Sequence, residues 1–327
     1  MQRDPQTVDG NDLKVFSGRS NPPLAEHICK HLGVSLAKSR IEDFPDSEII
    51  FKVDEDIRGR DVFIVQPTCE PVNDSLMELL IMLDCVRRAS ARRITAVVPY
   101  FGYARQDQKH EGRTPISAKL VANLITTAGA NRVVTMDLHA GQVQGFFDVP
   151  LDHLQAQPVF INYFLDQKLG PLTLVSPDVG NAKVDGEFAR RLGADLAVID
   201  KRRISDSEVE ACNIIGDVAG KTVLMFDDMI TTAATICAAA NLLKERGAGN
   251  IYAGATHPVL CGPAVERLAA APIEQVVVAD TVPIGSAKTK QLPSLKVLSV
   301  AGLLAEAIRR IHYNLSVSSL FQREVSI

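Results

Sequence analysis

Short apolar runs alternate with amphipathic helical patterns along most of this chain. Nine runs have the length and apolar character of buried strands. They are residues 14–18, 61–67, 94–100, 132–139, 172–178, 196–201, 222–228, 251–257 and 275–280. Between strands, residues 73–89 keep an apolar stripe behind an Asn or Asp helix cap, and residues 117–128 are similar. This β/α alternation predicts an α/β fold with mostly parallel sheets flanked by helices.

The alternation breaks near residues 150–171, a segment that carries several prolines. We therefore expect a polar, disordered tail at residues 1–12, an N-terminal domain at 13–155 and a C-terminal domain at 156–327. A strand followed by acids occurs in both halves, as VVTMDLHAG and as VLMFDDMIT. That likeness suggests two domains of one fold.

The composition is typical of a water-soluble protein of about two domains. Of 327 residues, 46% are hydrophobic and 23% are charged. The formal net charge of -4 gives no electrostatic footprint for nucleic acid or an anionic membrane. No apolar run approaches the roughly 18 residues of a spanning helix, and the N-terminus lacks the apolar core of a signal peptide. We expect a cytoplasmic protein that binds neither nucleic acid nor a membrane.

Cysteine spacing gives no sign of a metal site or a disulfide framework. The six cysteines have no CxxC pair among them: Cys29, Cys69, Cys85, Cys212, Cys237 and Cys261. Buried reduced thiols are therefore the expected state, in agreement with a cytoplasmic location.

The strongest candidate for ligand binding is a strand-turn-helix pattern in the second half of the chain. Its apolar run ends in Asp227 and Asp228, and a turn rich in threonine and alanine then opens a helical pattern. Open α/β sheets bind ligands at the carboxyl ends of strands, and helix N-termini attract anions. The two carboxylates would accept hydrogen bonds from ribose hydroxyls, and Thr231, Thr232 and Thr235 would donate to its 5-phosphate. An ordinary strand-to-helix connection with a solvated acidic pair would show the same pattern.

Two predicted strands end in possible metal ligands. His139 follows the strand 132–139, and a neutral imidazole can ligate a divalent metal or bond a phosphate. Asp178 ends another strand, and carboxylate oxygen is the ligand that Mg²⁺ prefers. A structural histidine and a plain turn are the alternatives for these two positions.

Two polar segments offer groups for phosphates and bases. DKRR, at residues 200–203, is expected to open a loop after the apolar LAVI, and cations placed there would stabilise phosphoryl transfer. In the turn-rich YARQDQKHEGRTP, Arg105 would contact phosphate or stack on a purine, Gln106 would read the purine edge and Asp107 would order both. Solvated surface loops would have the same composition.

Seven collinear stretches make the chain resemble the ribose-phosphate diphosphokinase family, also called phosphoribosyl pyrophosphate synthetases. The match runs from about Val15 to Phe321. The stretches are NDSLMELLIMLD, PYFGYARQDQK, TMDLHAGQVQGFFDVPLDHL, SPDVG, DKRR, FDDMI and LSVAGLLAEAIRRIHYNLSVSSLF. The resemblance implies Mg²⁺-dependent transfer of the β,γ-diphosphoryl group of ATP to the 1-hydroxyl of ribose 5-phosphate, with release of AMP. It also implies two tandem type I phosphoribosyltransferase-like domains, and a homo-oligomer that in this family is a hexamer.

The resemblance also assigns roles to residues. Lys201 and Arg203 would be the catalytic cations, and His139 and Asp178 the metal ligands. The residues that would bind ATP are Phe44, Asp46, Ser47, Glu48, Arg105, Gln106 and Asp107. Those that would bind ribose 5-phosphate are Arg203, Asp227, Asp228, Thr231, Thr232, Ala233, Ala234 and Thr235. In the family the element FPDSE, residues 44–48, comes from a neighbouring subunit, so activity would depend on assembly.

The chain departs from the family pattern at several ligand loops. Where the family reads DDMIDTAGT, this chain has Thr231 for aspartate and Ala234 for glycine. An alanine in left-handed geometry costs about 1 to 2 kcal/mol, so if Ala234 is forced into that geometry it would weaken binding of ribose 5-phosphate about 5- to 30-fold. Asn181 and Ser47 also stand where glycine is common, and Gln108 where arginine is common.

Two other functions stay open. A noncatalytic regulatory homologue of the synthetase is suggested by the altered phosphate loop. Six polar residues that a protein kept only for assembly has no need of argue against it: His139, Asp178, Lys201, Arg203, Asp227 and Asp228. A type I phosphoribosyltransferase for a nucleobase shares the strand-turn-helix cradle, but it would need neither YARQDQK, DKRR nor a second domain.

Overall fold

The computed structural model describes residues 12–109, 111–177, 182–203 and 209–320, without the side chains of 182–184, 201–203, 209–212 and 319. The expected tail falls almost wholly on residues outside this description. The chain divides into two units. Unit 1 holds the residues up to Ala156, residues 281–283 and those from Ser299 on. Unit 2 holds Gln157–Asp280 and Ile284–Leu298.

The first break between the units lies one residue from the boundary expected at 155/156. The C-terminal part differs from the expectation of one continuous domain, because the chain returns to unit 1 after Leu298. The physical reason is the helix at residues 301–312, which buries seven apolar side chains and packs beside the first helix of the chain.

The main sheet of unit 1 contains five strands in the order β1-β4-β5-β6-β7, and all neighbours are parallel. The strands are β1 (Leu13–Ser17), β4 (Asp61–Val65), β5 (Arg93–Val98), β6 (Arg132–Met136) and β7 (Leu151–Leu154). Side chains of β4 and β5 are buried at nearly every position, which explains their continuous apolar runs.

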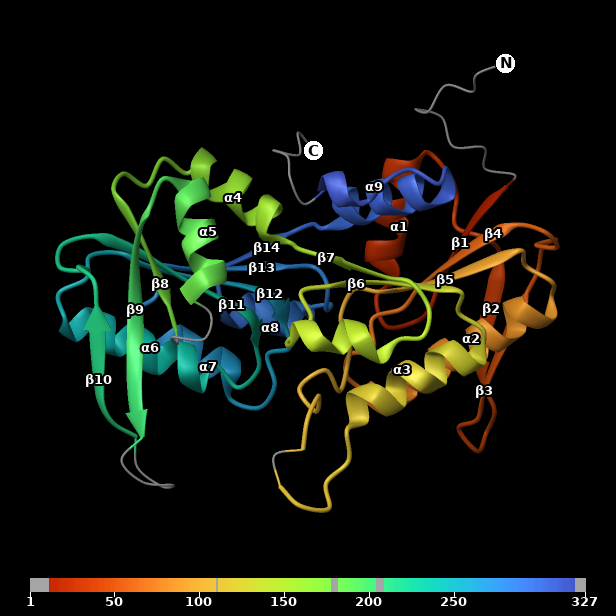
Figure 1. The fold of residues 1–327 in the computed structure, drawn as a ribbon, viewed down its shortest axis with the longest axis horizontal. Coiled ribbons are helices and arrows are strands. Elements are labelled where there is room, and N and C mark those ends of the chain that lie inside the picture. The colour runs from red at the N-terminus through yellow and green to blue at the C-terminus, as the bar shows by residue number, and fades with distance from the viewer. Residues whose placement is uncertain (1–11, 110, 178–181, 204–208, 321–327) are drawn as a thin grey trace. The chain divides into compact units, whose positions relative to one another are not determined.

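Helices cover both faces of this sheet (Figure 1). On one face lie α1 (Pro22–Leu32) and α9 (Ala301–His312), and on the other α2 (Val72–Arg88) and α3 (Ser117–Ala128). The 3-10 helices η1 (Gly141–Phe146) and η2 (Ser318–Leu320) complete the unit. The core between the sheet and the second helix pair includes Leu79, Met82 and Ile125, all fully buried.

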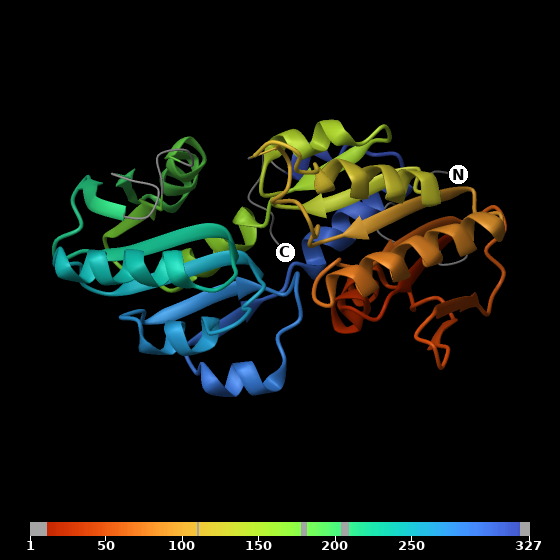
Figure 2. The same cartoon turned by 90° about the horizontal axis from the view of Figure 1, so that it is seen from below.

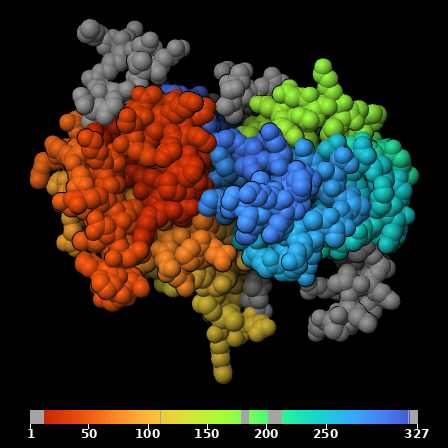
Figure 3. Space-filling model, turned by 180° about the vertical axis from the view of Figure 1, so that it is seen from behind, coloured from red at the N-terminus to blue at the C-terminus, as the bar shows by residue number. Residues whose placement is uncertain are grey.

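A two-stranded antiparallel hairpin stands apart from the main sheet of unit 1. It consists of β2 (Ser39–Asp43) and β3 (Ile49–Val53), and residues 44–48 form its tip. The tip projects from unit 1 as the orange-red lobe at the lower left of Figure 3. Sequence patterning did not predict these strands, because most of their side chains are exposed or only half-buried.

The sheet of unit 2 contains seven strands in the order β10-β9-β8-β11-β12-β13-β14. Only the β9-β10 pair is antiparallel. The strands are β8 (Leu172–Ser176), β9 (Asp195–Arg203), β10 (Val209–Ile215), β11 (Thr222–Ile230), β12 (Ile251–Pro258), β13 (Gln275–Ala279) and β14 (Leu295–Leu298).

The helices of unit 2 also cover both faces of its sheet (Figure 2). They are α4 (Gln157–Asp166), α5 (Ala182–Leu192), α6 (Ala234–Glu245), α7 (Ala264–Ala270) and α8 (Ser286–Gln291). One core cluster joins buried side chains of β11 and β12 to those of α6 and α7, such as Leu243 and Leu268. The expected fold class, α/β with mostly parallel sheets flanked by helices, is confirmed.

All nine predicted strands exist, and they are β1, β4, β5, β6, β8, β9, β11, β12 and β13. The expected cap of the helix at 73–89 is wrong. The helix begins at Val72 with Pro71 at the cap position, and no described side chain caps it. Asn73 instead accepts a hydrogen bond from the hydroxyl of Tyr103.

None of the helices in the described ranges is both long and apolar enough to cross a membrane. The five cysteines whose side chains are described carry free thiols. Cys212 lies among the side chains outside the description.

Candidate active site

Seven of the predicted site residues lie on loops that follow parallel strands. Residues 105–107 follow β5, His139 follows β6, and residues 231–233 follow β11. The hairpin tip 44–48 and the pair at 201 and 203 lie elsewhere in the fold. Because the two units are described separately, each group of residues is placed within its own unit.

Asp227 and Asp228 were expected at the carboxyl end of their strand, and they lie within its last four residues, because β11 continues to Ile230. On one side β11 continues to pair with β12 as far as Ile230. On the other side pairing with β8 stops at Met225, so both acids lie beyond the last paired residue of β8. Both are half-buried, and the Asp227 carboxylate accepts the amide N–H of Asp228 at 2.9 Å. The two carboxylates therefore lie on the part of β11 that extends past its pairing with β8.

A packed aromatic cluster fixes the strand just before these acids. The ring of Phe226 meets those of Phe160 and Phe188 edge-on, with centroids 4.7 and 4.9 Å away. Gly254 on β12 gives the ring its space, because a Cβ there would lie 2.7 Å from Cδ2 of Phe226. The backbone that carries Asp227 is therefore held rigidly from the core.

Two backbone carbonyls of the loop 231–233 accept hydrogen bonds from residues later in the chain. The carbonyl of Thr231 accepts the N–H of Cys261 at 3.0 Å, and that of Thr232 accepts Nη1 of Arg267 at 2.9 Å. α6 then begins at Ala234, and no described side chain caps its first turn. A helix N-terminus of this kind presents backbone N–H groups to an anion, while the carbonyls that would repel it are occupied.

The strain expected at Ala234 falls on its neighbour. Ala233 has the left-handed geometry, with φ 59° and ψ 8°, whereas Ala234 is the first residue of α6. The altered position therefore does not need the freedom of glycine in this structure. The 5- to 30-fold loss was expected only if Ala234 were forced into left-handed geometry, and that condition is not met in this structure.

The DKRR segment forms part of a strand rather than the opening of a loop. Residues 200–203 are the last four of β9, which pairs with β10 in an antiparallel hairpin. Lys201 pairs with Cys212 and Arg203 with Val209, with an irregularity of register between the two partners. The side chains of Lys201 and Arg203 lie outside the description.

Of the two predicted metal ligands, His139 lies among the described residues. His139 lies in the connection from β6 to η1 with its side chain exposed. Asp178 lies outside the described residues. Among the side chains that are described, no three His, Cys, Asp or Glu residues form a group able to hold a metal ion.

His153 is a residue that the sequence patterns missed. Its Nε2 accepts the backbone N–H of Leu138 at 2.8 Å, directly beside His139. Burial lowers the pKa of His153, which keeps its imidazole neutral and able to accept this bond. The contact joins β7 to the loop after β6. The only signal in the sequence was its place in DHL, within a stretch shared with the family.

The segment 105–107 is anchored through Gln106 and Asp107. The backbone carbonyl of Gln106 accepts the N–H of Ala118, and its side-chain oxygen accepts the Ser117 hydroxyl at 2.5 Å. Asp107 is buried and accepts Nε2 of Gln142 in η1, so it orders η1 rather than its two neighbours. Arg105 is exposed. The segment therefore presents Arg105 to solvent from a fixed backbone.

The hairpin tip forms a closed turn with an exposed aromatic ring. The amide of Phe44 donates to the carbonyl of Glu48 and the amide of Ser47 to that of Phe44, each at 2.8 Å. Ser47 has φ 72°, the left-handed geometry that explains why glycine is common there. The side chain of Phe44 is 48% exposed, more than a large apolar ring usually is.

Comparison with known proteins places the chain in a family. The N-terminal domain of ribose phosphate pyrophosphokinase matches residues 13–129, and the phosphoribosyl synthetase-associated domain matches residues 202–322. A ribose-phosphate pyrophosphokinase of Rhodopirellula baltica is 58% identical over 314 residues, which are 95% of this chain and 99% of that protein. The chain belongs to the ribose-phosphate pyrophosphokinase family. The resemblance drawn from the sequence motifs is thereby confirmed.

Other members of this pyrophosphokinase family match at similar length. A ribose-phosphate pyrophosphokinase of Synechococcus elongatus is 52% identical, over 97% of this chain and 96% of that protein. The crystal structure of phosphoribosylpyrophosphate synthetase from Mycobacterium smegmatis is similar with a TM-score of 0.87 and 45% identity, over 93% of this chain and 99% of that one. Matches across both units argue against the alternative of a nucleobase phosphoribosyltransferase.

Proposed function

We propose that the protein transfers the β,γ-diphosphoryl group of ATP to the 1-hydroxyl of ribose 5-phosphate. The hydroxyl oxygen bonds to the β-phosphorus, the bond from that phosphorus to the α-phosphate oxygen breaks, and the hydroxyl proton passes to solvent. The products are phosphoribosyl diphosphate and AMP. Besides family membership, one observation supports the proposal. The first turn of α6 has no side-chain cap, the carbonyls of Thr231 and Thr232 before it already accept hydrogen bonds, and the half-buried Asp227 and Asp228 lie on the preceding strand.

Ribose 5-phosphate would bind along the end of β11. The carboxylates of Asp227 and Asp228 would accept hydrogen bonds from the ribose hydroxyls. The 5-phosphate would meet the hydroxyls of Thr231, Thr232 and Thr235 and the backbone N–H groups at the start of α6, including those of Ala233 and Ala234. In this arrangement Thr231 would favour binding of the 5-phosphate, because its hydroxyl would donate a hydrogen bond where the carboxylate of the family's aspartate would repel the anion.

ATP would bind to residues of unit 1. Arg105 would contact the nucleotide with its exposed guanidinium, with Gln106 beside it and Asp107 fixing the backbone through η1. The exposed ring of Phe44 would cover the base, and Asp46, Ser47 and Glu48 would offer acceptors to the base or its ribose.

Lys201 and Arg203 would supply the positive charge for the transition state. Phosphoryl transfer needs cations that tighten on the phosphate oxygens as the bond to the leaving group breaks, and one such group contributes about 10³ to 10⁵ in rate. Alternate positions of a strand share a face, so positions 201 and 203 of β9 are suited to act as a pair. Arg203 would also contact ribose 5-phosphate.

A divalent metal, Mg²⁺, belongs to this proposal, held by His139 and Asp178. Mg²⁺ is usually bound by one or two protein ligands together with substrate phosphates and water, so these two side chains would be enough. When bound, the metal would neutralise negative charge on the phosphates of ATP. His153 would orient the loop that carries His139 through its bond to Leu138.

We also propose that the protein is a cytoplasmic homo-oligomer. The exposed Phe44 on a projecting tip is suited to contact a second copy, as the family's assembly implies. A hexamer is the form expected from the family resemblance.

The first test is AMP formation by the purified protein from ATP, Mg²⁺ and ribose 5-phosphate, with and without inorganic phosphate. AMP that forms only with the sugar would support diphosphoryl transfer. No AMP from folded, assembled protein at any phosphate level would contradict the proposal and favour the noncatalytic regulatory homologue.

A further inference from the structure

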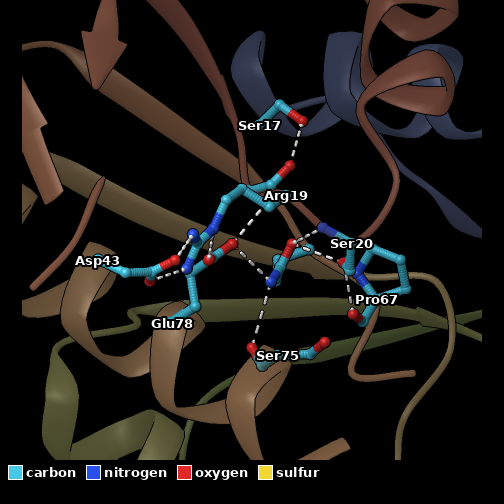
Figure 4. Close-up of polar contacts among 9 residues, drawn as sticks. Ser17, Arg19, Ser20, Asp43, Pro67, Ser75 and Glu78 are labelled. Atoms are coloured by element: carbon cyan, nitrogen blue, oxygen red, sulfur yellow. Dashed lines mark hydrogen bonds and ion pairs between the residues drawn. The ribbon is translucent and has the colours of Figure 1, made fainter. Parts of the chain in front are cut away.

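Five polar side chains at the base of the hairpin tip form a cluster that no motif had suggested. We call it the tip anchor: Arg19, Ser20, Asp43, Gln66 and Glu78. Arg19 and Ser20 connect β1 to α1, Asp43 ends β2, Gln66 follows β4 and Glu78 lies in α2. Figure 4 shows Arg19 between Glu78 on one side and Asp43 on the other.

The inner half of the tip anchor is the buried carboxylate of Glu78 and the groups that donate hydrogen bonds to it. Glu78 is 3% exposed. It accepts the backbone N–H of Arg19 at 2.6 Å, Nε of Arg19 at 2.5 Å and Nε2 of Gln66 at 3.0 Å. A buried charge is tolerated only when it is paired and hydrogen-bonded, so these contacts fix Arg19 against α2.

Gln66 is itself held, which makes the inner half rigid. Its side-chain oxygen accepts the hydroxyl of Ser20 at 2.6 Å, and its amide also donates to the carbonyl of Ser75 at 3.2 Å. Gly18 leaves the space that this side chain fills, because a Cβ on Gly18 would lie 2.1 Å from the Gln66 oxygen. The residue before Arg19 is therefore glycine for reasons of space.

The outer half of the tip anchor is a two-bond fork onto the hairpin. Nη1 and Nη2 of Arg19 donate to the two carboxylate oxygens of Asp43 at 2.7 and 2.8 Å. Each guanidinium nitrogen thus has a carboxylate partner, and the planar fork fixes direction as well as distance. Since two carboxylates already neutralise the single charge of Arg19, the cluster is suited to support the hairpin rather than to bind an anion.

The residue after Asp43 is Phe44, the first of the tip. A two-stranded hairpin is marginally stable alone, and this one is separate from the main sheet. Its strand β3 is fixed at Phe51, whose ring meets that of Phe16 with centroids 5.9 Å apart. We propose that Arg19 is a positioning residue for the hairpin tip. By joining Asp43 to the buried Glu78, Arg19 fixes the orientation of the tip that carries Phe44, Asp46 and Glu48.

The inference deepens the proposed function, since it rests on the tip as an ATP-binding element. The hairpin offers a matched control at its other end. There Arg40 makes a similar fork onto Asp54, with Nε at 2.8 Å and Nη2 at 3.2 Å from the two oxygens. Asp43→Asn and Asp54→Asn therefore each weaken one exposed fork on the same hairpin, and only the first touches Arg19.

The experiment compares these two variants of the full-length protein in hydrogen–deuterium exchange and in steady-state kinetics. Exposed ion pairs contribute about 0 to 1 kcal/mol, so both variants should fold with a melting temperature near that of the wild type. In D43N the amides of residues 44–48 should exchange faster and the KM for ATP should rise roughly three- to tenfold, with the KM for ribose 5-phosphate unchanged. D54N should match the wild type in all three measurements. Arg19→Lys, which keeps the charge and loses the fork, should behave as D43N does.

Equal exchange of residues 44–48 in D43N and D54N would overturn the inference. So would a D43N variant in which both KM values rise alike or only kcat falls, because a general structural role would do that. If neither wild type nor D54N forms AMP, the proposed function fails, while the exchange comparison still decides whether Arg19 holds the tip.

Discussion

At the scale of single residues, the start of α6 shows that a departure from a family pattern need not strain the backbone. Ala233 carries the left-handed geometry, at a position where the family pattern DDMIDTAGT also has alanine. Ala234, the residue that differs, begins α6 with ordinary helical geometry. The left-handed geometry therefore lies at Ala233, a residue that this chain shares with its family.

Replacing Ala234 by glycine tests this point. Because Ala234 needs no positive φ, we expect the KM of A234G for ribose 5-phosphate to stay within about twofold of the wild type. A glycine in the first turn of α6 should also lower the free energy of unfolding by up to about 1 kcal/mol. Initial rates of AMP formation against ribose 5-phosphate concentration, with urea unfolding, measure both quantities.

Ala238→Gly is the matched control, since Ala238 is exposed in the interior of the same helix. It should cost about 1 kcal/mol of stability and leave the KM unchanged. A KM five or more times lower in A234G would mean that the loop adopts left-handed geometry at position 234 when the sugar binds.

At the scale of elements, one buried ionic network fixes α9 to the sheet of unit 1. Asp61, at the start of β4, is fully buried and is bonded by Nε of Arg93 and Nδ1 of His312, each at 2.8 Å. Arg93 also donates to the carbonyl of Ile311 at 2.8 Å and to Asn314 at 3.0 Å. Burial raises the pKa of Asp61, but the hydrogen bonds from His312 and Arg93 outweigh it, so the pKa lies below its usual range.

Asp61→Asn should therefore destabilise the protein strongly near neutral pH. Removing one partner of a buried ion pair costs about 3 to 5 kcal/mol, because Arg93 and His312 lose their shared carboxylate. A lowered carboxyl pKa gives stability that is complete above the unfolded value, about 4, and is lost as the pH falls toward the folded value. The difference between wild type and D61N in urea unfolding should be constant above about pH 5 and shrink below about pH 4.

Asp84→Asn is the control for this network. Asp84 is an exposed carboxylate of α2 that pairs with Arg87 and Arg88, so its loss should cost no more than about 1 kcal/mol. A difference for D61N as small as that for D84N would show that Asp61 does not hold α9.

At the scale of the whole molecule, the proposed reaction uses residues of both units. The groups proposed for ATP belong to unit 1, and those proposed for ribose 5-phosphate and the cations belong to unit 2. Of the departures from the family pattern, Thr231 lies in the loop after β11, Ala234 begins α6, and Ser47 has the left-handed φ for which glycine is common. They do not by themselves point to a noncatalytic homologue.

Lys201→Ala tests the chemistry of the proposal. If Lys201 stabilises the transition state, kcat should fall by about 10³ or more while the dissociation constant of ATP changes only a few-fold. Rapid-quench measurement of AMP and equilibrium binding of ATP separate the two. Lys221→Ala is the control: this lysine of unit 2 pairs with Asp195 and Asp217 at the surface, and its loss should leave kcat unchanged. Turnover of K201A close to that of the wild type would remove Lys201 from the mechanism.

Sequence patterning predicted strands well where apolar residues fill a buried strand. All nine apolar runs became strands of the two main sheets, since parallel strands are buried on both faces. It failed for β2, β3, β7, β10 and β14, which are short, polar or at an edge, and for the cap of α2. Within the candidate site the acids of β11 and the threonine loop remain predictions, and the left-handed residue is Ala233, one position before the alanine at which strain was considered.

The sequence by itself determined the α/β fold class, the approximate break between the two units and, through its motifs, the family. These depend on local periodicity and on short runs of residues, which a chain carries wherever it folds. Only the tertiary structure decided that α9 returns to unit 1, that His153 holds the loop beside His139, and that Arg19 joins Glu78 to Asp43. The physical reason is that each of these contacts joins residues far apart in the chain, and polar side chains carry no periodic signal of the partners they will meet.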